Sequence, residues 1–74
     1  MEVEQERNPL WLILVETVHK LPLYPSHKAY LRDTLLLDSP EITVEEISRR
    51  LNIPLGEVMV IIHEIREEIK NSSA

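Results

Sequence analysis

Apolar residues recur along this chain at the spacing of helix faces, and no stretch alternates between apolar and polar residues as a strand would. The clearest stripe lies near the C-terminus and consists of Val58, Ile62, Ile65 and Ile69. Steps of four and three residues keep these side chains on one side of a helix. We therefore expect a long helix that begins at Pro54, ends at about Ile69 and buries this face.

The first half of the chain predicts two more helices. Asn8-Pro9 is a good helix start, because Asn caps and Pro suits the first helical position, so we expect a helix from Pro9 to about Lys20. Its LWLILV run is apolar on every side, which predicts a central helix or one that covers a neighbour on two sides. After the turn LPLYPS, Ser26 is expected to cap a second helix from His27 to about Leu37.

Thr43-Val44-Glu45-Glu46 has the pattern of a capping box. In such a box the Thr43 hydroxyl accepts from the Glu46 amide, and the Glu46 side chain reaches back to the Thr43 amide. The pattern predicts a short helix from Val44 to Leu51. Asn52 suits the left-handed residue that often ends a helix, and Pro54 suits the start of the next one.

A short capped helix, a tight turn and a longer helix are the parts of a helix-turn-helix. Ile47 and Leu51 are expected to face inward, with Ile53 in the turn and Val58 and Ile61 closing the angle. Ser48 is small where the two helices would cross. The alternative is an ordinary helical hairpin.

These elements predict an all-α, four-helix domain that ends in a helix-turn-helix without a wing. A chain of 74 residues is enough for one domain. Within residues 1–74 we expect a frayed N-terminus over 1–8, two supporting helices over 9–37, the helix-turn-helix over 43–70 and a tail over 71–74.

Composition narrows the classes of protein that fit. The chain has no cysteine, so neither disulfides nor thiolate metal sites can stabilise it. The acidic opening MEVEQER is unlike an export signal, and the longest apolar run is too short for a membrane span, so a cytoplasmic protein without membrane contact is expected. The net charge of −5 is unusual for a nucleic-acid binder, which ordinarily neutralises phosphates with a basic surface.

Residues 42–69, ITVEEISRRLNIPLGEVMVIIHEIREEI, resemble region four of bacterial sigma factors. The similarity is carried by Glu46-Ile47-Ser48, Leu51-Asn52-Ile53-Pro54, Gly56, Val58 and the spacing of His63 and Arg66. Leu21-Pro22 and the helix through Tyr30-Leu31-Arg32 resemble the leading helices of that family, so the similarity covers about residues 14–69. It implies a transcription-related domain whose last helix reads the −35 promoter element and which contacts RNA polymerase.

The resemblance also implies a set of DNA-binding residues. The edge of the last helix that would face the major groove holds Leu55, Gly56, Met59, Val60 and His63. The phosphate-binding side chains would be Arg49, Arg50, Arg66 and Lys70. Backbone amides at Leu55 and Gly56 are a further candidate for a phosphate contact, because they lie at a helix N-terminus.

This edge offers few of the hydrogen-bonding and basic side chains that DNA recognition uses. Met59 and Val60 offer apolar contact but no bidentate hydrogen bonds to bases. Arg49 and Arg50 follow Glu45 and Glu46 by four residues, which predicts pairing on a solvated face. We therefore expect weak duplex binding.

A protein-interaction module that uses Leu55, Met59 and Val60 is the alternative. Met59 and Val60 lie off the buried stripe and are expected to be at least partly exposed. If the first helix folds over them, they are core residues instead. A monomer and a homodimer both fit the sequence.

Catalytic chemistry is not evident. His19, His27 and His63 fall on three predicted helices without a second His or Cys at ligand spacing, so no metal site is expected. Glu64, Glu67 and Glu68 are expected to face water. Gly56 is the only glycine, which excludes a Gly-rich phosphate loop. We therefore expect neither an enzyme nor a cofactor.

Overall fold

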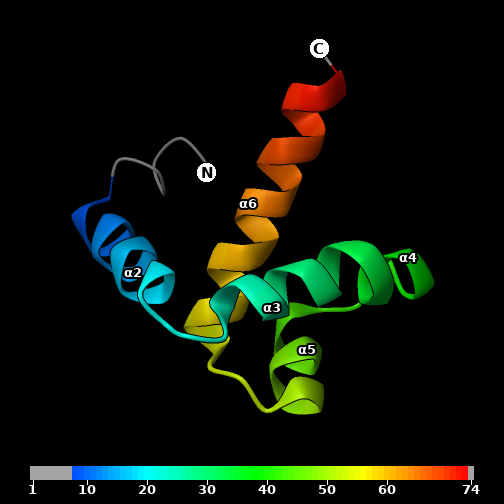
Figure 1. The fold of residues 1–74 in the computed structure, drawn as a ribbon, viewed down its shortest axis with the longest axis horizontal. Coiled ribbons are helices and arrows are strands. Elements are labelled where there is room, and N and C mark those ends of the chain that lie inside the picture. Colours follow the sequence, from blue (N-terminus) through cyan, green and yellow to red (C-terminus); the bar gives the residue numbers. More distant parts are fainter. Residues whose placement is uncertain (1–7, 74) are drawn as a thin grey trace.

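A computed structural model describes residues 8–73 of the chain, and its helices account for most of them (Figure 1). They are α2 (Pro9–His19), α3 (Tyr24–Tyr30), the π-helical turn η1 (Leu31–Leu35), α4 (Leu36–Asp38), α5 (Val44–Leu51) and α6 (Leu55–Ser73). Since α3, η1 and α4 follow one another without a break, the described residues form four helical segments and no strand. The predicted all-α class is confirmed. The frayed start expected for residues 1–7 lies outside the described residues.

The first helix begins where its sequence predicted. The Asn8 side chain accepts a hydrogen bond from the Leu10 amide at 2.8 Å, and Pro9 occupies the first helical position, where its missing amide costs nothing. The helix ends at His19, one residue earlier than expected. Asn8 is therefore the helix cap, as its position before Pro9 predicted, although the expected frayed segment 1–8 also included it.

The second helix begins three residues earlier than expected, at Tyr24. Ser26 lies inside it and is not its cap, so that prediction was wrong. Pro25 is tolerated in the first turn, where amides have no partner within the helix, and the His27 amide bonds the Leu23 carbonyl at 2.9 Å. In η1 the Leu36 amide bonds the carbonyl of Leu31, five residues back.

The main core lies where α5 and α6 meet the helix formed by α3, η1 and α4. Its buried members are Leu31, Leu35, Ile47, Ile53, Val58, Ile61, Ile62 and Ile65. The predicted stripe of α6 is thus buried over three of its four residues. Ile69 is 61% exposed, and α6 continues to Ser73, so the expected burial of Ile69 and the expected tail from residue 71 were wrong. The reason is visible in Figure 1, where the last turns of α6 extend past the other helices.

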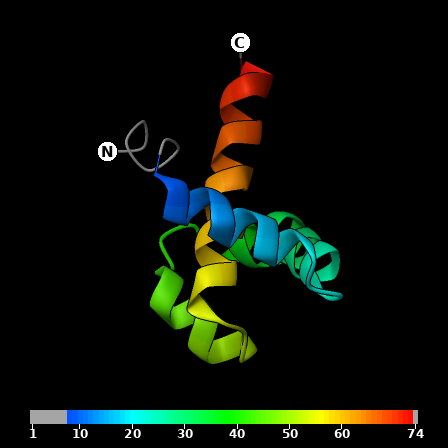
Figure 2. The same cartoon turned by 90° about the vertical axis from the view of Figure 1, so that its left-hand side faces the viewer.

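A second, smaller core joins α2 to α6. Trp11 and Val18 of α2 pack on Val60 of α6, and α2 crosses in front of α6 in Figure 2. Leu12 and Ile13, on the outer side of α2, are exposed. The run LWLILV therefore belongs to a peripheral helix with one buried side, not to a central one.

Candidate functional site

The predicted helix-turn-helix region consists of α5, the turn at residues 52–54, and α6. Thr43 caps α5, since its hydroxyl accepts from the Glu46 amide at 3.1 Å. The Glu46 carboxylate does not complete the capping box and lies instead 3.4 Å from the Arg50 guanidinium. Asn52 ends α5 with φ 55° and ψ 48°, the left-handed conformation expected from the sequence.

Ser48 holds the turn together through both its backbone and its side chain. Its carbonyl accepts from the Asn52 amide and from the Ile53 amide, the latter at 3.2 Å. Its hydroxyl donates to the Ile53 carbonyl at 2.7 Å. Small size was the reason this position stood out in the sequence, and these bonds to the turn are an additional role. They fix the start of α6 relative to α5.

The residues predicted to face a DNA groove lie on two different sides of α6. Met59, 36% exposed, is open to solvent together with Leu55, Arg66 and Lys70. The other three residues, Gly56, Val60 and His63, lie on the side that α2 covers. The sequence pattern assigned these five residues to one edge of the helix, whereas in the fold α2 covers three of them and leaves two exposed.

The contacts between α2 and α6 are close. A Cβ atom added at Gly56 would lie 3.0 Å from Cδ1 of Leu14, so this glycine allows the two helices to approach. Val60 is fully buried under Trp11 and Val18. The Trp11 and His63 rings meet edge to face with centroids 5.3 Å apart.

The expected exposure of Val60 was wrong, and the alternative, in which the first helix folds over the residue, is correct for Val60. Met59 is exposed as expected. Because Val60 is buried, Leu55, Met59 and Val60 do not form one open apolar surface.

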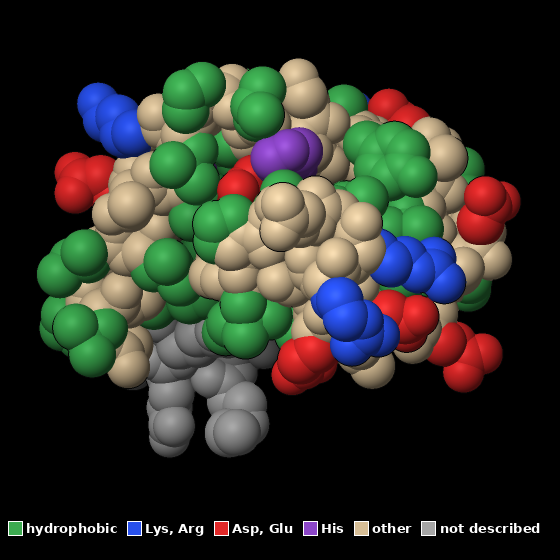
Figure 3. All heavy atoms as spheres, turned by 90° about the horizontal axis from the view of Figure 1, so that it is seen from below, with side chains coloured by type: hydrophobic (Ala, Val, Ile, Leu, Met, Phe, Trp, Pro, Cys, Tyr) green, Lys and Arg blue, Asp and Glu red, His purple; other side chains and the backbone are tan. Residues whose placement is uncertain are grey.

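The predicted phosphate-binding side chains are exposed but few. Arg50 pairs with Glu46 as the four-residue spacing indicated, whereas Arg49, Arg66 and Lys70 form no ion pair within residues 8–73. Figure 3 views the molecule from the α5 side, and the basic side chains visible there stand next to acidic ones. This face therefore carries no continuous basic surface.

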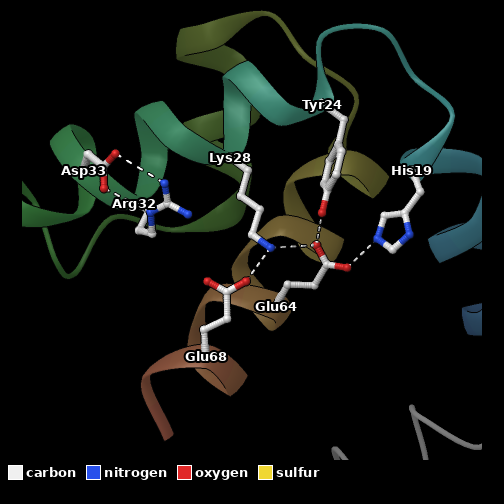
Figure 4. A network of polar contacts seen from close by, with 7 residues as sticks. All are labelled: His19, Tyr24, Lys28, Arg32, Asp33, Glu64 and Glu68. Carbon is white, nitrogen blue, oxygen red and sulfur yellow. Dashed lines mark hydrogen bonds and ion pairs between the residues drawn. The ribbon is translucent and has the colours of Figure 1, made fainter. Parts of the chain in front are cut away.

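A polar network of five side chains connects α2, α3 and α6 (Figure 4). Its centre is Glu64, whose carboxylate accepts from the Tyr24 hydroxyl and lies 2.5 Å from Nε2 of His19. Lys28 lies 3.6 Å from Glu64 and 2.5 Å from Glu68. The expectation that Glu64 and Glu68 simply face water was wrong, because α3 brings a cation and a hydroxyl to them.

The network shifts the pKa values of its members. Burial alone would raise the pKa of the Glu64 carboxyl, but the bonds from Tyr24 and His19 and the charge of Lys28 together lower it. Burial and the bond to Glu64 raise the pKa of the Tyr24 hydroxyl. Burial works against the charge of Lys28, yet its carboxylate partners raise its pKa overall. All three groups thus keep their ordinary charge state near neutral pH.

A second histidine–carboxylate contact lies deeper in the molecule. Nδ1 of His27 is 2.5 Å from Oε2 of Glu57, whose side chain is only 3% exposed. The tautomer of the ring decides which of the two groups donates the hydrogen bond. The contact satisfies a carboxylate that would otherwise be costly to bury.

These carboxylates act as links between helices. Glu57 of α6 contacts His27 of α3, and Glu64 contacts His19 of α2 as well as Tyr24 and Lys28 of α3. Within the described part of the chain, no group of three or more His, Asp or Glu side chains is arranged to hold a metal ion. The sequence signal for these contacts was the spacing of Glu57, Glu64 and Glu68, which puts the three carboxylates on one side of α6.

The described residues also include an open groove of about 530 Å³ on the far side of α6 from α2. One wall is α6, with Ile62, Ile65, Arg66 and Ile69. The other wall comes from Arg32, the end of α4 and the segment that leads into α5, with Leu36, Leu37, Pro40, Glu41, Ile42, Thr43 and Val44. Most of the lining side chains are apolar. Nothing in the sequence pattern indicated this groove, because it depends on where α4 ends beside α6.

Comparison with known proteins adds no relative. No family model, curated protein or solved structure matches this chain. Among the helices of residues 8–73, none combines the length and the apolar character that a bilayer span requires.

Proposed function

We propose that this domain uses a helix-turn-helix scaffold to bind protein rather than to read DNA, in a transcription-related role. The observation that carries the proposal is the position of α2. It lies across the side of α6 that holds Gly56, Val60 and His63, three of the five residues assigned to the DNA-facing edge.

The dimensions of the DNA major groove support the proposal. An α-helix with its side chains is about 10–12 Å across, and the major groove is about 12 Å wide, so a reading helix enters it alone. Here α2 is attached to α6 through Trp11, Leu14 and Val60, and the pair is wider than the groove. Only the arc with Leu55 and Met59 remains open on the first turns of α6.

Charge supports the same conclusion. Phosphate contacts supply most of the affinity of non-specific DNA binding, and this chain has a net charge of −5. The cations of the predicted interface are four, and Arg50 already has an acidic partner. Protein contacts do not require a basic surface.

The surface proposed for a protein partner is the outer side of α2. Leu10, Leu12 and Ile13 are exposed there within a little more than one helical turn, and the same part of the molecule is rich in hydrophobic side chains in Figure 3. Contiguous exposed apolar side chains often mark a contact surface. By its resemblance to sigma region four, the partner belongs to the transcription machinery.

Site-specific photo-crosslinking in cells tests this proposal. A photoreactive residue at position 12 is expected to give discrete protein adducts, and one at position 59 is expected to give no nucleic-acid adduct. Position 34, which is exposed on η1, is the matched control for non-specific protein adducts. Nucleic-acid adducts at position 59 that disappear in Arg66→Ala, or identical protein adducts at positions 12 and 34, would overturn the proposal.

A further inference from the structure

We infer that the groove between α4 and the C-terminal half of α6 binds a second copy of this chain, related to the first by a two-fold axis. In this arrangement Leu37 and Ile69 of each copy enter the groove of the other. The inference goes beyond the proposed function, because self-association through this groove leaves the outer side of α2 free for another partner.

The first observation is an apolar helix face that continues from the core into solvent. Ile62 and Ile65 are buried in the core and also line the groove, and Ile69, next on the same face, is 61% exposed. The turns that carry Ile69 extend past the other helices (Figure 1). An isoleucine that continues a buried stripe but lies beyond its own fold is suited to burial against another chain.

The opposite wall has the same character. Leu37 is 74% exposed at the end of α4, and Leu36, Ile42 and Val44 are only partly buried beside it. Two protruding apolar side chains, Leu37 and Ile69, thus border an apolar hollow. A surface that carries both protrusions and a hollow can fit a copy of itself.

Charge favours a second copy over an unrelated helix. Arg66 lies on the α6 wall and Glu41 on the other wall, both are exposed, and neither forms an ion pair within residues 8–73. In a two-fold interface, a residue that contacts a second residue is contacted by that same residue from the partner. Arg66 of one copy is expected to meet Glu41 of the other, which gives two such pairs across the interface. Arg32, the third charged residue of the lining, is already paired with Asp33 of its own chain.

The size of the groove sets the expected strength. A standard interface buries about 800 Å² per partner, roughly one seventh of the 5380 Å² surface of this chain. A single open groove of about 530 Å³ is a small contact site, so we expect a weak or transient dimer. Self-association is therefore expected at tens to hundreds of micromolar, within the reach of sedimentation equilibrium.

The experiment measures mass against concentration from about 1 μM to 1 mM, in buffer without DNA or another protein. The wild-type chain is expected to pass from monomer to dimer, and Ile69→Lys to raise the dissociation constant at least about tenfold, which is 1.4 kcal/mol. Leu23→Lys is the matched control, because Leu23 is 61% exposed, like Ile69, and does not line the groove. Circular dichroism confirms that each variant is folded.

Charge reversal tests the two-fold pairing. Glu41→Arg and Arg66→Glu each put like charges together and are expected to weaken the dimer, whereas the double variant restores both pairs and the dimer with them. A wild-type chain that stays monomeric at 1 mM would overturn the inference, as would a dimer that Leu23→Lys disrupts and Ile69→Lys does not. Failure of the double variant to restore association would overturn the two-fold arrangement. None of these results depends on the partner proposed for α2.

Discussion

Single polar side chains define the ends of the helices that meet at the turn. Thr43 supplies one acceptor to the first amides of α5, and Asn52 adopts the left-handed conformation that ends it. The Ser48 hydroxyl donates to the Ile53 carbonyl, which links α5 to the chain that enters α6. Each of these interactions spans five residues or fewer, which is why the sequence predicted the boundaries of α5 so well.

Replacing Thr43 by alanine tests the cap directly. Thr43→Ala removes the acceptor of the Glu46 amide and is expected to cost about 0.5–2 kcal/mol of stability. For a domain of this size each kcal/mol corresponds to about 4–8 °C in Tm, which a thermal melt resolves. Thr34→Ala is the control, because Thr34 is an exposed threonine within η1. Equal Tm values for the two variants would show that Thr43 does not cap α5.

Glu64 gives a prediction with a defined pH dependence. Glu64→Gln keeps the shape of the side chain but removes the charge that Tyr24, His19 and Lys28 stabilise, so a loss of about 1.5–3 kcal/mol is expected at pH 7. The pKa of this carboxyl is lower in the folded state than its ordinary value of 4.5. Its stabilising contribution is therefore complete above pH 4.5 and is lost as the pH falls through the folded-state pKa.

Urea unfolding of wild type and Glu64→Gln between pH 7 and pH 3 measures this dependence. The difference in unfolding free energy is expected to shrink on acidification, because the protonated wild-type side chain is as neutral as glutamine. Glu16→Gln on exposed α2 is the control. A difference that stays constant over the whole pH range would contradict the role given to Glu64.

At the scale of elements, the position of α2 is what the sequence failed to predict. Its capped start was readable, since Asn8 and Pro9 act locally. Its docking was not, because a run that is apolar on every side does not indicate which side is buried. The structure buries the side with Trp11 and Val18, and this choice decides the exposure of Val60 on a helix more than forty positions away.

The polar links between helices were missed for a related physical reason. His27 and Glu57 are thirty residues apart, and His19 and Glu64 are forty-five apart. Helix periodicity puts the glutamates on one side of α6 but gives no information about which element faces that side. Likewise, the periodic stripe predicted burial of Ile69, but α6 extends beyond the helices that could cover this residue.

Separate changes at Met59 and Val60 test the docking of α2 on α6. Val60→Ser removes apolar contacts with Trp11 and Val18 and buries a hydroxyl, so a loss of about 2–4 kcal/mol is expected. Met59→Lys adds a charge to a side chain that is already open to water and is expected to change stability by no more than about 0.5 kcal/mol. Chemical denaturation measures both. Similar effects of the two changes would mean that α2 does not cover this side of α6.

At the scale of the whole molecule, the same chain presents three surfaces of different character. The outer side of α2 is apolar, the groove beside the end of α6 is mostly apolar with Arg32, Arg66 and Glu41 on its walls, and the α5 part of the face seen in Figure 3 carries mixed charges. A DNA-binding domain concentrates its cations where its reading helix is open. In this domain the solvent-exposed side of the first turns of α6 is narrow. The cations near it are few, and the net charge of the chain is negative.

Duplex titration at several salt concentrations tests this whole-molecule balance. Binding of random duplex is expected to be no tighter than about 10⁻⁴ M at physiological salt, the weak end of non-specific binding. Even if Arg49, Arg50, Arg66 and Lys70 all contacted phosphates, the logarithm of the binding constant would fall with a slope of only about −3.6 against the logarithm of salt concentration. Arg49→Ala is expected to change this weak binding little, because α2 keeps α6 out of the groove. Three results would contradict this expectation: sub-micromolar affinity, a slope clearly steeper than this limit, or a large loss of affinity in Arg49→Ala. Any of them would mean that α2 moves away from α6 when DNA binds. The domain would then read DNA with α6 after the displacement of α2.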